Sequence, residues 1–285
     1  MVGERKDHAA VLFSGGSDST LAAAQMLDEF DRITLLTFQP GFLLFIENTR
    51  VHARKLEQVF GSERVRHEII DIKETISAVL GANVMADLNE YGFNMTSLVC
   101  LGCRLSMHSV AIAWCLENKV PYLADGSIRA QSTIPEQMES VIRRNRRFYS
   151  EEYGIRHFSP IYEESESDRR LEELGIADKN KLKKQFILFD TQATCPFGVP
   201  ADVYGRLFYG RLVGKQREDD SEQYCAEKYP RMRHNIGQVL GTRGLDVDQL
   251  VEGLREIRRS DGDLGPTQGD SVAFDLALGK DIGGI

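Results

Sequence analysis

The sequence SGGSDST at residues 14–20 stands between two apolar segments, AAVLF at 9–13 and LAAAQML at 21–27. The first segment is a short apolar run typical of a buried strand, and the second carries apolar residues at a spacing that suits one face of a helix. Glycine lets an anion approach the backbone, and N–H groups at a helix N-terminus bind anions without a basic side chain. The stretch therefore predicts a strand, an anion-binding turn and a helix.

The residues of this turn are suited to phosphate. Glycine gives close access, Ser and Thr add hydroxyl donors, and Asp18 can hold a magnesium ion that bridges phosphate oxygens. The turn has no Lys, unlike the Walker A sequence, and it lacks the GxGxxG of a dinucleotide fold. A helix cap alone would need only one such residue. The expected phosphate and magnesium contacts are Ser14, Gly15, Gly16, Ser17, Asp18, Ser19 and Thr20.

Strands and helices alternate along the first 200 residues. Further apolar runs predict strands at 33–38, 67–72, 120–126 and 157–162, and helical patterns predict helices at 48–61, 106–119 and 168–176. Within the first of these helices we expect Asn48 to be the N-cap and Gly61 the stop. This alternation predicts an α/β fold with a doubly wound parallel five-stranded sheet. From about residue 200 the pattern becomes mostly helical, which predicts a domain at 1–198 and a helical C-terminal extension at 199–285.

Composition places the chain among ordinary globular proteins. It has 285 residues, 42% hydrophobic and 27% charged, and a net charge of -8 that argues against non-specific coating of nucleic acid. No stretch approaches the roughly 18 to 20 consecutive apolar residues of a membrane span, and the first residues lack the apolar segment of a secretory signal. We therefore expect a cytoplasmic protein that does not associate with membranes.

SGGSDST behind a first strand resembles the SGGxDS signature of the PP-loop, or N-type, ATP pyrophosphatases, whose sheet is adenine nucleotide alpha-hydrolase-like. The resemblance covers roughly residues 8–198 and implies that ATP is cleaved between its α and β phosphates, so that a substrate oxygen becomes adenylated. It also implies nucleotide contacts at Phe38 and Gly126. Many relatives carry two acidic residues in the loop that here reads GSIRAQ (126–131), so a second magnesium carboxylate is missing there. Arg129 is expected to contact phosphate or substrate instead.

The cysteines bear on the step that would follow adenylation of the substrate. Cys100 and Cys103 form a CxxC that is expected to precede or open a helix, whose dipole lowers the pKa of a thiol. Together with Cys195, the pair resembles the three thiolates that hold a 4Fe-4S cluster in the cluster-dependent tRNA thiolation enzymes of the PP-loop group. Such a cluster has one iron free to bind sulfide. Cys115 and Cys225 are expected to be packing residues.

Three alternatives for the CxxC stay open. Zinc would suit these thiols with a fourth ligand, for which His108 and His157 are candidates. A pair of cysteines without metal can carry and resolve a persulfide. Buried cysteines without a chemical role are the third.

Three basic segments bear on the substrate. RRNRR at 143–147 is followed by Phe148 and Tyr149, a combination that suits an RNA backbone and a stacked base, although a solvated helix face explains it equally well. The other two segments lie at 206–217 and 228–234. Because ATP is itself anionic, these segments favour an anionic substrate without identifying tRNA.

These observations predict an ATP-dependent adenylating enzyme that releases pyrophosphate and then transfers sulfur to tRNA or a small nucleobase-like molecule. Asp18, Cys100, Cys103 and Cys195 are the expected catalytic residues, and ATP, Mg²⁺ and a 4Fe-4S cluster the expected cofactors. A sulfur-donor protein and a homodimer through the C-terminal helices are possible partners. The alternatives are an amidating or nitrile-forming ligase without a cluster, and a nucleotide-binding regulatory subunit.

Overall fold

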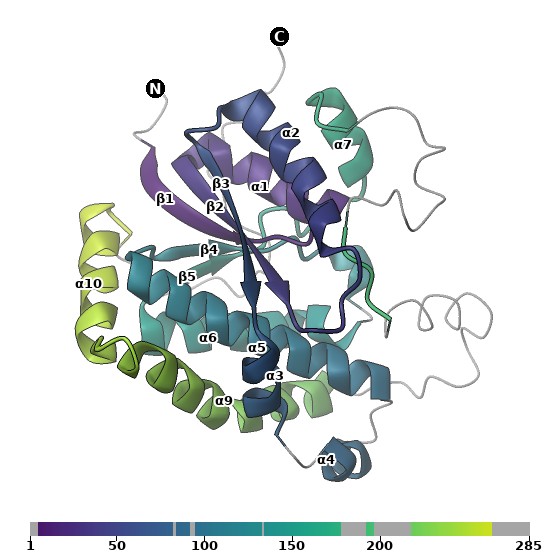
Figure 1. The fold of residues 1–285 in the computed structure, drawn as a ribbon, viewed down its shortest axis with the longest axis vertical. Helices are drawn as coiled ribbons and strands as arrows, with labels where there is room; N and C mark the ends of the chain where they lie inside the picture. The colour runs from purple at the N-terminus through teal and green to yellow at the C-terminus, as the bar shows by residue number, and fades with distance from the viewer. Residues whose placement is uncertain are drawn as a thin grey trace, which may run out of the picture.

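A central sheet of parallel strands organises the molecule (Figure 1). The computed structural model describes residues 5–81, 84–91, 95–132, 134–177, 192–196 and 218–263. The strands are β1 (Lys6–Leu12), β2 (Phe30–Gln39), β3 (Val65–Asp71), β4 (Tyr122–Ala124) and β5 (Arg156–Phe158). Their order across the sheet is β3-β2-β1-β4-β5, and every pair is parallel. The predicted five-stranded, doubly wound parallel sheet is confirmed.

The order of the strands creates a crevice beside β1. The chain first winds from β1 through β2 to β3 on one side and then returns to place β4 on the other side of β1. The segments that follow β1 and β4 therefore leave the sheet in opposite directions, and ligands of such sheets bind between them at the carboxyl ends of the strands. The second half of β1, Ala9–Leu12, is apolar, as expected of a strand that helices cover on both faces, and Ala9, Ala10 and Val11 are fully buried.

Helices cover both faces of the sheet in two separate hydrophobic clusters. One cluster joins the sheet to α1 (Ser17–Glu29), α2 (Arg50–Phe60) and α7 (Ser167–Glu173). The other joins it to α3 (Lys73–Leu80), α4 (Val84–Tyr91), α5 (Met95–Asn118), α6 (Glu139–Tyr153), α9 (Glu218–Gly241) and α10 (Val247–Ser260). The connections also contain the short 3₁₀ helices η1 (Ile46–Thr49), η2 (Arg129–Gln131) and η3 (Pro135–Gln137).

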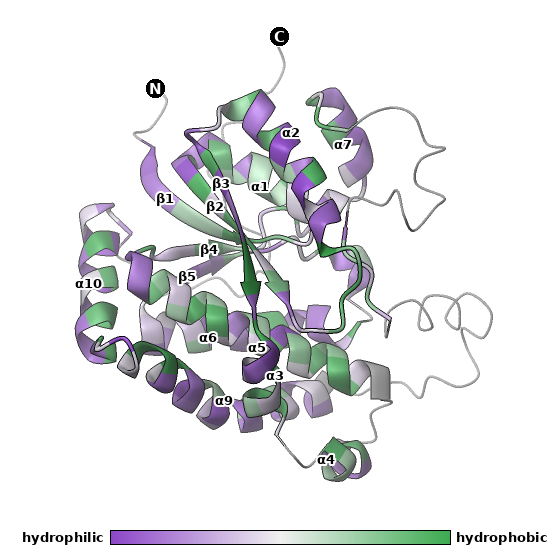
Figure 2. Ribbon diagram, viewed as in Figure 1, coloured by the Kyte–Doolittle hydropathy of each residue, from purple (hydrophilic) through white to green (hydrophobic). Residues whose placement is uncertain are grey.

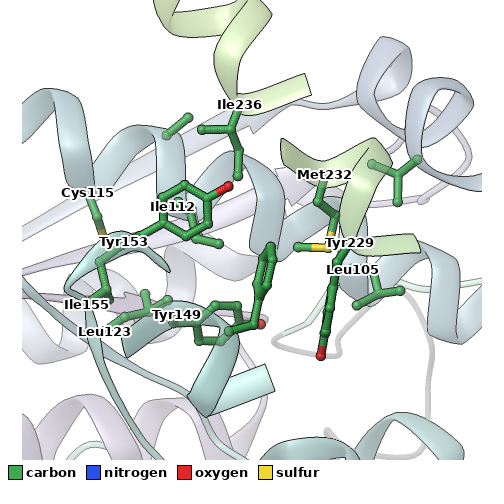
Figure 3. Packing of buried hydrophobic residues seen from close by; sticks show 14 of the residues in the cluster. Leu105, Ile112, Cys115, Leu123, Tyr149, Tyr153, Ile155, Tyr229, Met232 and Ile236 are labelled. Carbon is green, nitrogen blue, oxygen red and sulfur yellow. The ribbon is translucent and has the colours of Figure 1, made fainter. Parts of the chain in front are cut away.

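The C-terminal helices α9 and α10 belong to the same core as the sheet. Tyr229, Met232 and Ile236 of α9 point toward Leu105 and Ile112 of α5 (Figure 3). The rings of Phe148 and Tyr229 stack with centroids 4.0 Å apart, which fixes α6 against α9. The predicted domain boundary at 198/199, the first part of the predicted helical extension (199–217) and the residues after 263 lie outside the described residues, apart from 192–196 before the boundary.

Helix α5 differs from its prediction in a way that matters for the cysteines. It begins at Met95 rather than near Ser106, so CLGC lies inside the helix and the prediction that it precedes or opens a helix is wrong. The cause is packing: Leu98, Leu101 and Leu105 follow a helical spacing and are all buried. Hydrophobic residues run along α5 in Figure 2. Its segment Ser97–Asn118 is long and apolar enough to cross a membrane, yet 61% of that segment is buried within the fold, as expected of a core helix.

Helix α2 begins two residues later than predicted. Asn48 lies in η1, and Thr49 takes the N-cap position, although its hydroxyl donates to the Ile46 carbonyl over 2.7 Å and makes no capping hydrogen bond to α2. Gly61 does end the helix, with φ of 104°, a conformation that glycine adopts without strain.

Candidate nucleotide-binding site

A cavity of about 940 Å³ opens at the carboxyl ends of the strands, in the crevice between β1 and β4. Its wall combines the turn after β1, the end of β2, the first half of α2, one face of α5, the segment after β4 and the start of α7. This volume is ample for a nucleotide, because small-molecule sites commonly measure about 300–1,000 Å³. The cavity therefore lies where the fold predicts a ligand.

The hydroxyl groups of SGGSDST mainly shape the turn itself. The hydroxyl of Ser19 donates to the carbonyl of Gly16 over 3.1 Å, and that of Thr20 donates to the same carbonyl over 2.8 Å. Ser14 and Ser19 share a further hydroxyl contact of 3.1 Å, and Gly15 has φ of 79°. The first N–H groups of α1 have no partner within the helix. Backbone donors, rather than most of the hydroxyls, are thus the groups available to an anion.

Gly126 allows the segment after β4 to touch the phosphate-binding turn. A Cβ atom at this position would lie 2.6 Å from the backbone nitrogen of Ser19 and 2.8 Å from its Cα atom. Real side chains do not approach backbone this closely, so the contact requires glycine. Gly126 therefore acts by close packing, and it also lines the cavity, as does Phe38 at the end of β2.

Carboxylates reach the cavity from three parts of the chain: Asp18 in the turn, Asp125 after β4, and Glu166 and Asp168 at the start of α7. Asp18 lines it and accepts a hydrogen bond from Gln131 Nε2 over 3.2 Å. Glu166 and Asp168, at the start of α7, line it as well, and Asp168 accepts a hydrogen bond from the Ser17 hydroxyl. Sequence reasoning missed these two residues. Their position just after the fifth strand was the available signal, because all parallel strands end at the same edge of the sheet.

Arg104 brings a buried charge network to the opposite wall. Its guanidinium forms an ion pair with Asp125, donates to Ser127 Oγ over 3.2 Å and donates through Nε to His108 Nε2 over 2.8 Å. Burial alone would raise the pKa of Asp125, but Arg104, His157 and Ser159 hold it well below its usual range. Burial, with Arg104 adding to the effect, holds the pKa of His108 well below its usual range. The network thus contains an ionised carboxylate and a neutral imidazole.

Arg129 lies elsewhere. It is not among the residues that line the cavity, and its Nε donates to Glu163 over 2.9 Å while its guanidinium lies 5.2 Å from the centroid of the Tyr162 ring. In this structure Arg129 therefore contacts Glu163 and Tyr162 instead of facing the cavity, where its contact with phosphate or substrate was expected.

The three cysteines predicted to act together approach one another from two segments. Cys100 and Cys103 lie on α5, and Cys195 follows Thr194, whose backbone N–H and C=O both pair with Leu44 at 2.9 and 3.0 Å. Cys195 is near enough to Cys100 and Cys103 to raise the pKa of each.

The environment of the thiols is the reverse of the expected one. Burial raises the pKa of Cys100 far above its usual value and that of Cys103 to about 12. The expected lowering is wrong because neither residue lies at the helix N-terminus. The donor set suits a soft metal centre in kind, but within the described residues no three His, Cys, Asp or Glu side chains form a group able to hold a metal ion. His108 and His157 belong to the Arg104–Asp125 network instead.

In the described parts of the basic segments, several of the charged side chains pair with carboxylates. Phe148 and Tyr149 are buried, so the prediction that they stack a base is wrong. Arg143 and Arg144 pair with Glu139 and Glu222, as the alternative of a solvated helix face anticipated. Lys228, in the third segment, forms a buried ion pair with Asp87 at 2.6 Å. The segment 206–217 lies outside the described residues.

A protein-family model matches the part of the chain that contains the phosphate-binding turn. The family model of QueC, described as queuosine biosynthesis protein QueC, matches residues 8–124. The match runs from β1 to the end of β4 and includes the whole of SGGSDST. It confirms the resemblance to the PP-loop proteins. None of the curated proteins matches the chain.

Similar solved structures include two archaeal proteins of low sequence identity. One, a predicted subunit of tRNA methyltransferase from Methanocaldococcus jannaschii, is 18% identical, with 59% of this chain and 74% of that chain covered and a TM-score of 0.40. The other, the U34-tRNA thiolase NcsA from Methanococcus maripaludis with its [4Fe-4S] cluster, is 12% identical, with 82% of this chain and 74% of that chain covered and a TM-score of 0.35. At these scores neither bears on the residues of this site.

Proposed function

We propose that this chain is an ATP pyrophosphatase that adenylates an oxygen atom of a nucleobase-like substrate, free or within tRNA. The observation that carries the proposal is the position of SGGSDST and Asp18 at the switch point of a parallel sheet, facing a cavity of about 940 Å³. The match to the QueC model over residues 8–124 supports it, since that family is named for the synthesis of a nucleoside.

The residues of the cavity fit the parts of this reaction. Backbone N–H groups at the start of α1 bind the pyrophosphate end of ATP. Magnesium is usually held by one or two carboxylates together with substrate phosphates, and Asp18 and Asp168 are oxygen donors of the right kind on the cavity wall. When bound, the metal balances phosphate charge. Pyrophosphate then leaves and AMP remains on the substrate oxygen, ready for displacement.

Product analysis tests this proposal. The purified chain is incubated with ATP, Mg²⁺ and total tRNA or a mixture of nucleobases, and pyrophosphate and orthophosphate are measured separately. We expect pyrophosphate and AMP, with loss of both in Asp18→Asn, which keeps the shape of the side chain but removes its charge. Formation of ADP and orthophosphate would refute it.

For the second half-reaction we propose sulfur transfer through Cys100, Cys103 and Cys195. The three thiols lie within electrostatic reach of one another, and Arg104, next to Cys103, lines the ATP cavity. High thiol pKa values disfavour a metal-free persulfide pair, because the thiolate is the nucleophile. These three thiolates would hold a 4Fe-4S cluster, whose open iron would supply sulfide to the carbon that bears the adenylated oxygen, with AMP as the leaving group. Anaerobic purification, an absorbance spectrum and an iron count test this half.

A ligase that delivers nitrogen without a cluster is the second candidate. It is favoured because no three His, Cys, Asp or Glu side chains among the described residues form a group that could hold a metal ion. The two candidates separate by product mass: with sulfide and ammonium both supplied under anaerobic conditions, ATP-dependent incorporation of sulfur supports the first and incorporation of nitrogen the second. ATP binding without turnover would favour a regulatory subunit.

A further inference from the structure

We propose that Arg104 binds the α-phosphate of the nucleotide, and that Asp125 and His108 hold its guanidinium in place for this contact. The inference deepens the proposed ATP pyrophosphatase function and rests on it. It assigns a cation to the part of ATP that SGGSDST does not reach, on the wall opposite α7.

The location of Arg104 follows from its partners. Asp125 and Ser127, which receive its Nη2 group, flank Gly126 in sequence. Gly126 in turn touches the backbone of Asp18 and Ser19 in the first turn of α1. The guanidinium therefore lies beside the phosphate-binding turn.

The Arg104 side chain is arranged for a ligand rather than for stability. It is 21% exposed and lines the cavity, whereas Asp125 is only 1% exposed. The desolvation cost of a buried ion pair can exceed the attraction between its charges. The pair with Asp125 therefore gives little reason by itself to expect a gain in folding stability. Asp125 and His108 occupy Nη2 and Nε of the guanidinium. Because a guanidinium presents donors on more than one edge, Nη1 remains to meet an anion in the cavity.

His108 supplies an independent sign that the arrangement is functional. Its Nε2 accepts the hydrogen bond from Arg104, so the ring proton of the neutral imidazole lies on Nδ1. Nδ1 is buried and has no hydrogen-bond partner among the described residues. An unsatisfied buried donor destabilises a fold, and such exceptions call for an explanation. The need for Nε2 to accept from Arg104, and so to hold the guanidinium in a fixed direction, explains why the proton lies on the unpaired Nδ1.

Two cations line the cavity within the described residues, and their positions differ. Lys55 lies on α2, on the side of β2, while Arg104 lies on α5, on the side of β4. Only Arg104 shares a network with the segment that packs on SGGSDST. The bidentate geometry of arginine also suits a phosphate better than the point charge of lysine.

A binding cycle tests the inference without knowledge of the acceptor. Affinities of AMP, adenosine and inorganic pyrophosphate are measured by calorimetry for the wild type and for Arg104→Gln. We expect the preference for AMP over adenosine to fall at least about tenfold in the variant, since a charge-assisted hydrogen bond is lost. Affinities for adenosine and pyrophosphate should stay within about twofold, because neither probe carries the α-phosphate.

Matched variants guard against a purely structural effect. Arg104→Gln leaves the buried Asp125 carboxylate without its partner, so the double variant Arg104→Gln/Asp125→Asn, which removes both charges, is measured in parallel. Arg104→Lys keeps the positive charge but loses the planar set of guanidinium donors. We expect its preference for AMP over adenosine to lie between those of the wild type and Arg104→Gln. Arg144→Gln removes a guanidinium that pairs with Glu222 outside the cavity, and should leave all three affinities unchanged.

The outcomes separate this inference from the function on which it rests. An unchanged AMP preference in Arg104→Gln and in the double variant, with pyrophosphate still bound, overturns the role of Arg104 alone. An equal loss for AMP and adenosine overturns it too, because it marks Arg104 as structural. A wild type that binds no pyrophosphate overturns the proposed function itself.

Discussion

The hydroxyl of Ser17, in the phosphate-binding turn, donates a hydrogen bond to the carboxylate of Asp168 at the start of α7. A hydroxyl has one proton to donate, so in this arrangement Ser17 offers none to a phosphate. The contact joins two segments that are 151 residues apart and closes α7 over the first turn of α1. Asp168 thus adds a negative charge to the cavity wall and occupies the hydroxyl proton of Ser17.

We predict that Asp168→Asn binds metal-free pyrophosphate several-fold more tightly than the wild type. The substitution removes one negative charge from the cavity wall, while its amide oxygen can still accept the hydrogen bond from Ser17. Calorimetry in the presence of a chelator measures the effect, and it should diminish as the salt concentration rises. Ser17→Ala, which keeps the carboxylate, is the matched control and should show no such gain; weaker binding in Asp168→Asn would contradict the prediction.

The close approach of Gly126 to Ser19 predicts that Gly126→Ala disrupts the site. The added methyl group would meet backbone atoms, so the turn must shift, at a cost of about 1–3 kcal/mol in unfolding free energy. Pyrophosphate binding should fall with it. Gly237→Ala in α9 is the control, because its Cβ would meet nothing within 4 Å and alanine favours a helix by about 0.5–1 kcal/mol. Equal stability of the two variants would rule out the role assigned to Gly126.

Buried histidines predict that the protein loses stability in mild acid. Burial lowers the pKa of His67 to about 4 and that of His8 to about 4, and lowers the pKa of His108 and His157 as well. In the unfolded chain these imidazoles take up protons near pH 6.5. Their contribution is complete above that pH and is lost as the pH falls toward 4, by at most about 1.4 kcal/mol per pH unit for each histidine.

Denaturant unfolding at pH 7.5, 6 and 5 checks this dependence. His67 contacts Thr37 Oγ1 over 2.8 Å, and His67→Gln keeps a hydrogen-bonding group at that place. The variant should show a smaller loss of stability between pH 7.5 and 5 than the wild type. His234→Gln, at an exposed position of α9, serves as control. A stability that is independent of pH across this range is incompatible with neutral buried imidazoles.

For the cysteines we predict that Cys100→Ala and Cys195→Ala each abolish metal content and sulfur transfer but leave pyrophosphate formation within a few-fold of the wild type. The thiols lie on α5 and beside Leu44, and none of the three lines the nucleotide cavity. Iron analysis after anaerobic purification should give about four irons per chain in the wild type. Cys115→Ala, at a fully buried position of the same helix, tests for loss of packing alone. A wild type without iron would favour the nitrogen-delivering alternative.

The fold and half of the site could be predicted because their signals are local. SGGSDST, its flanking apolar segments and the alternation of later strands and helices lie in contiguous sequence, and they specify a parallel sheet with an anion-binding turn. Arg104 and Asp168 could not be predicted in the same way, since only the shared carboxyl edge of the sheet brings α5 and α7 to that turn. The raised pKa of the Cys103 thiol could not be predicted either, because it depends on where α5 begins. The packing of Leu98 and Leu101, rather than a capping residue, decides that start.

The most direct test of the central claim is the fate of ATP labelled at its γ-phosphate. The account predicts that the label leaves as pyrophosphate, in equal amount to AMP, when ATP, Mg²⁺ and tRNA or a nucleobase mixture are supplied, and that Asp18→Asn releases none. Label recovered as orthophosphate together with ADP would contradict it, because a cavity built on SGGSDST would then be cleaving ATP at the other bond.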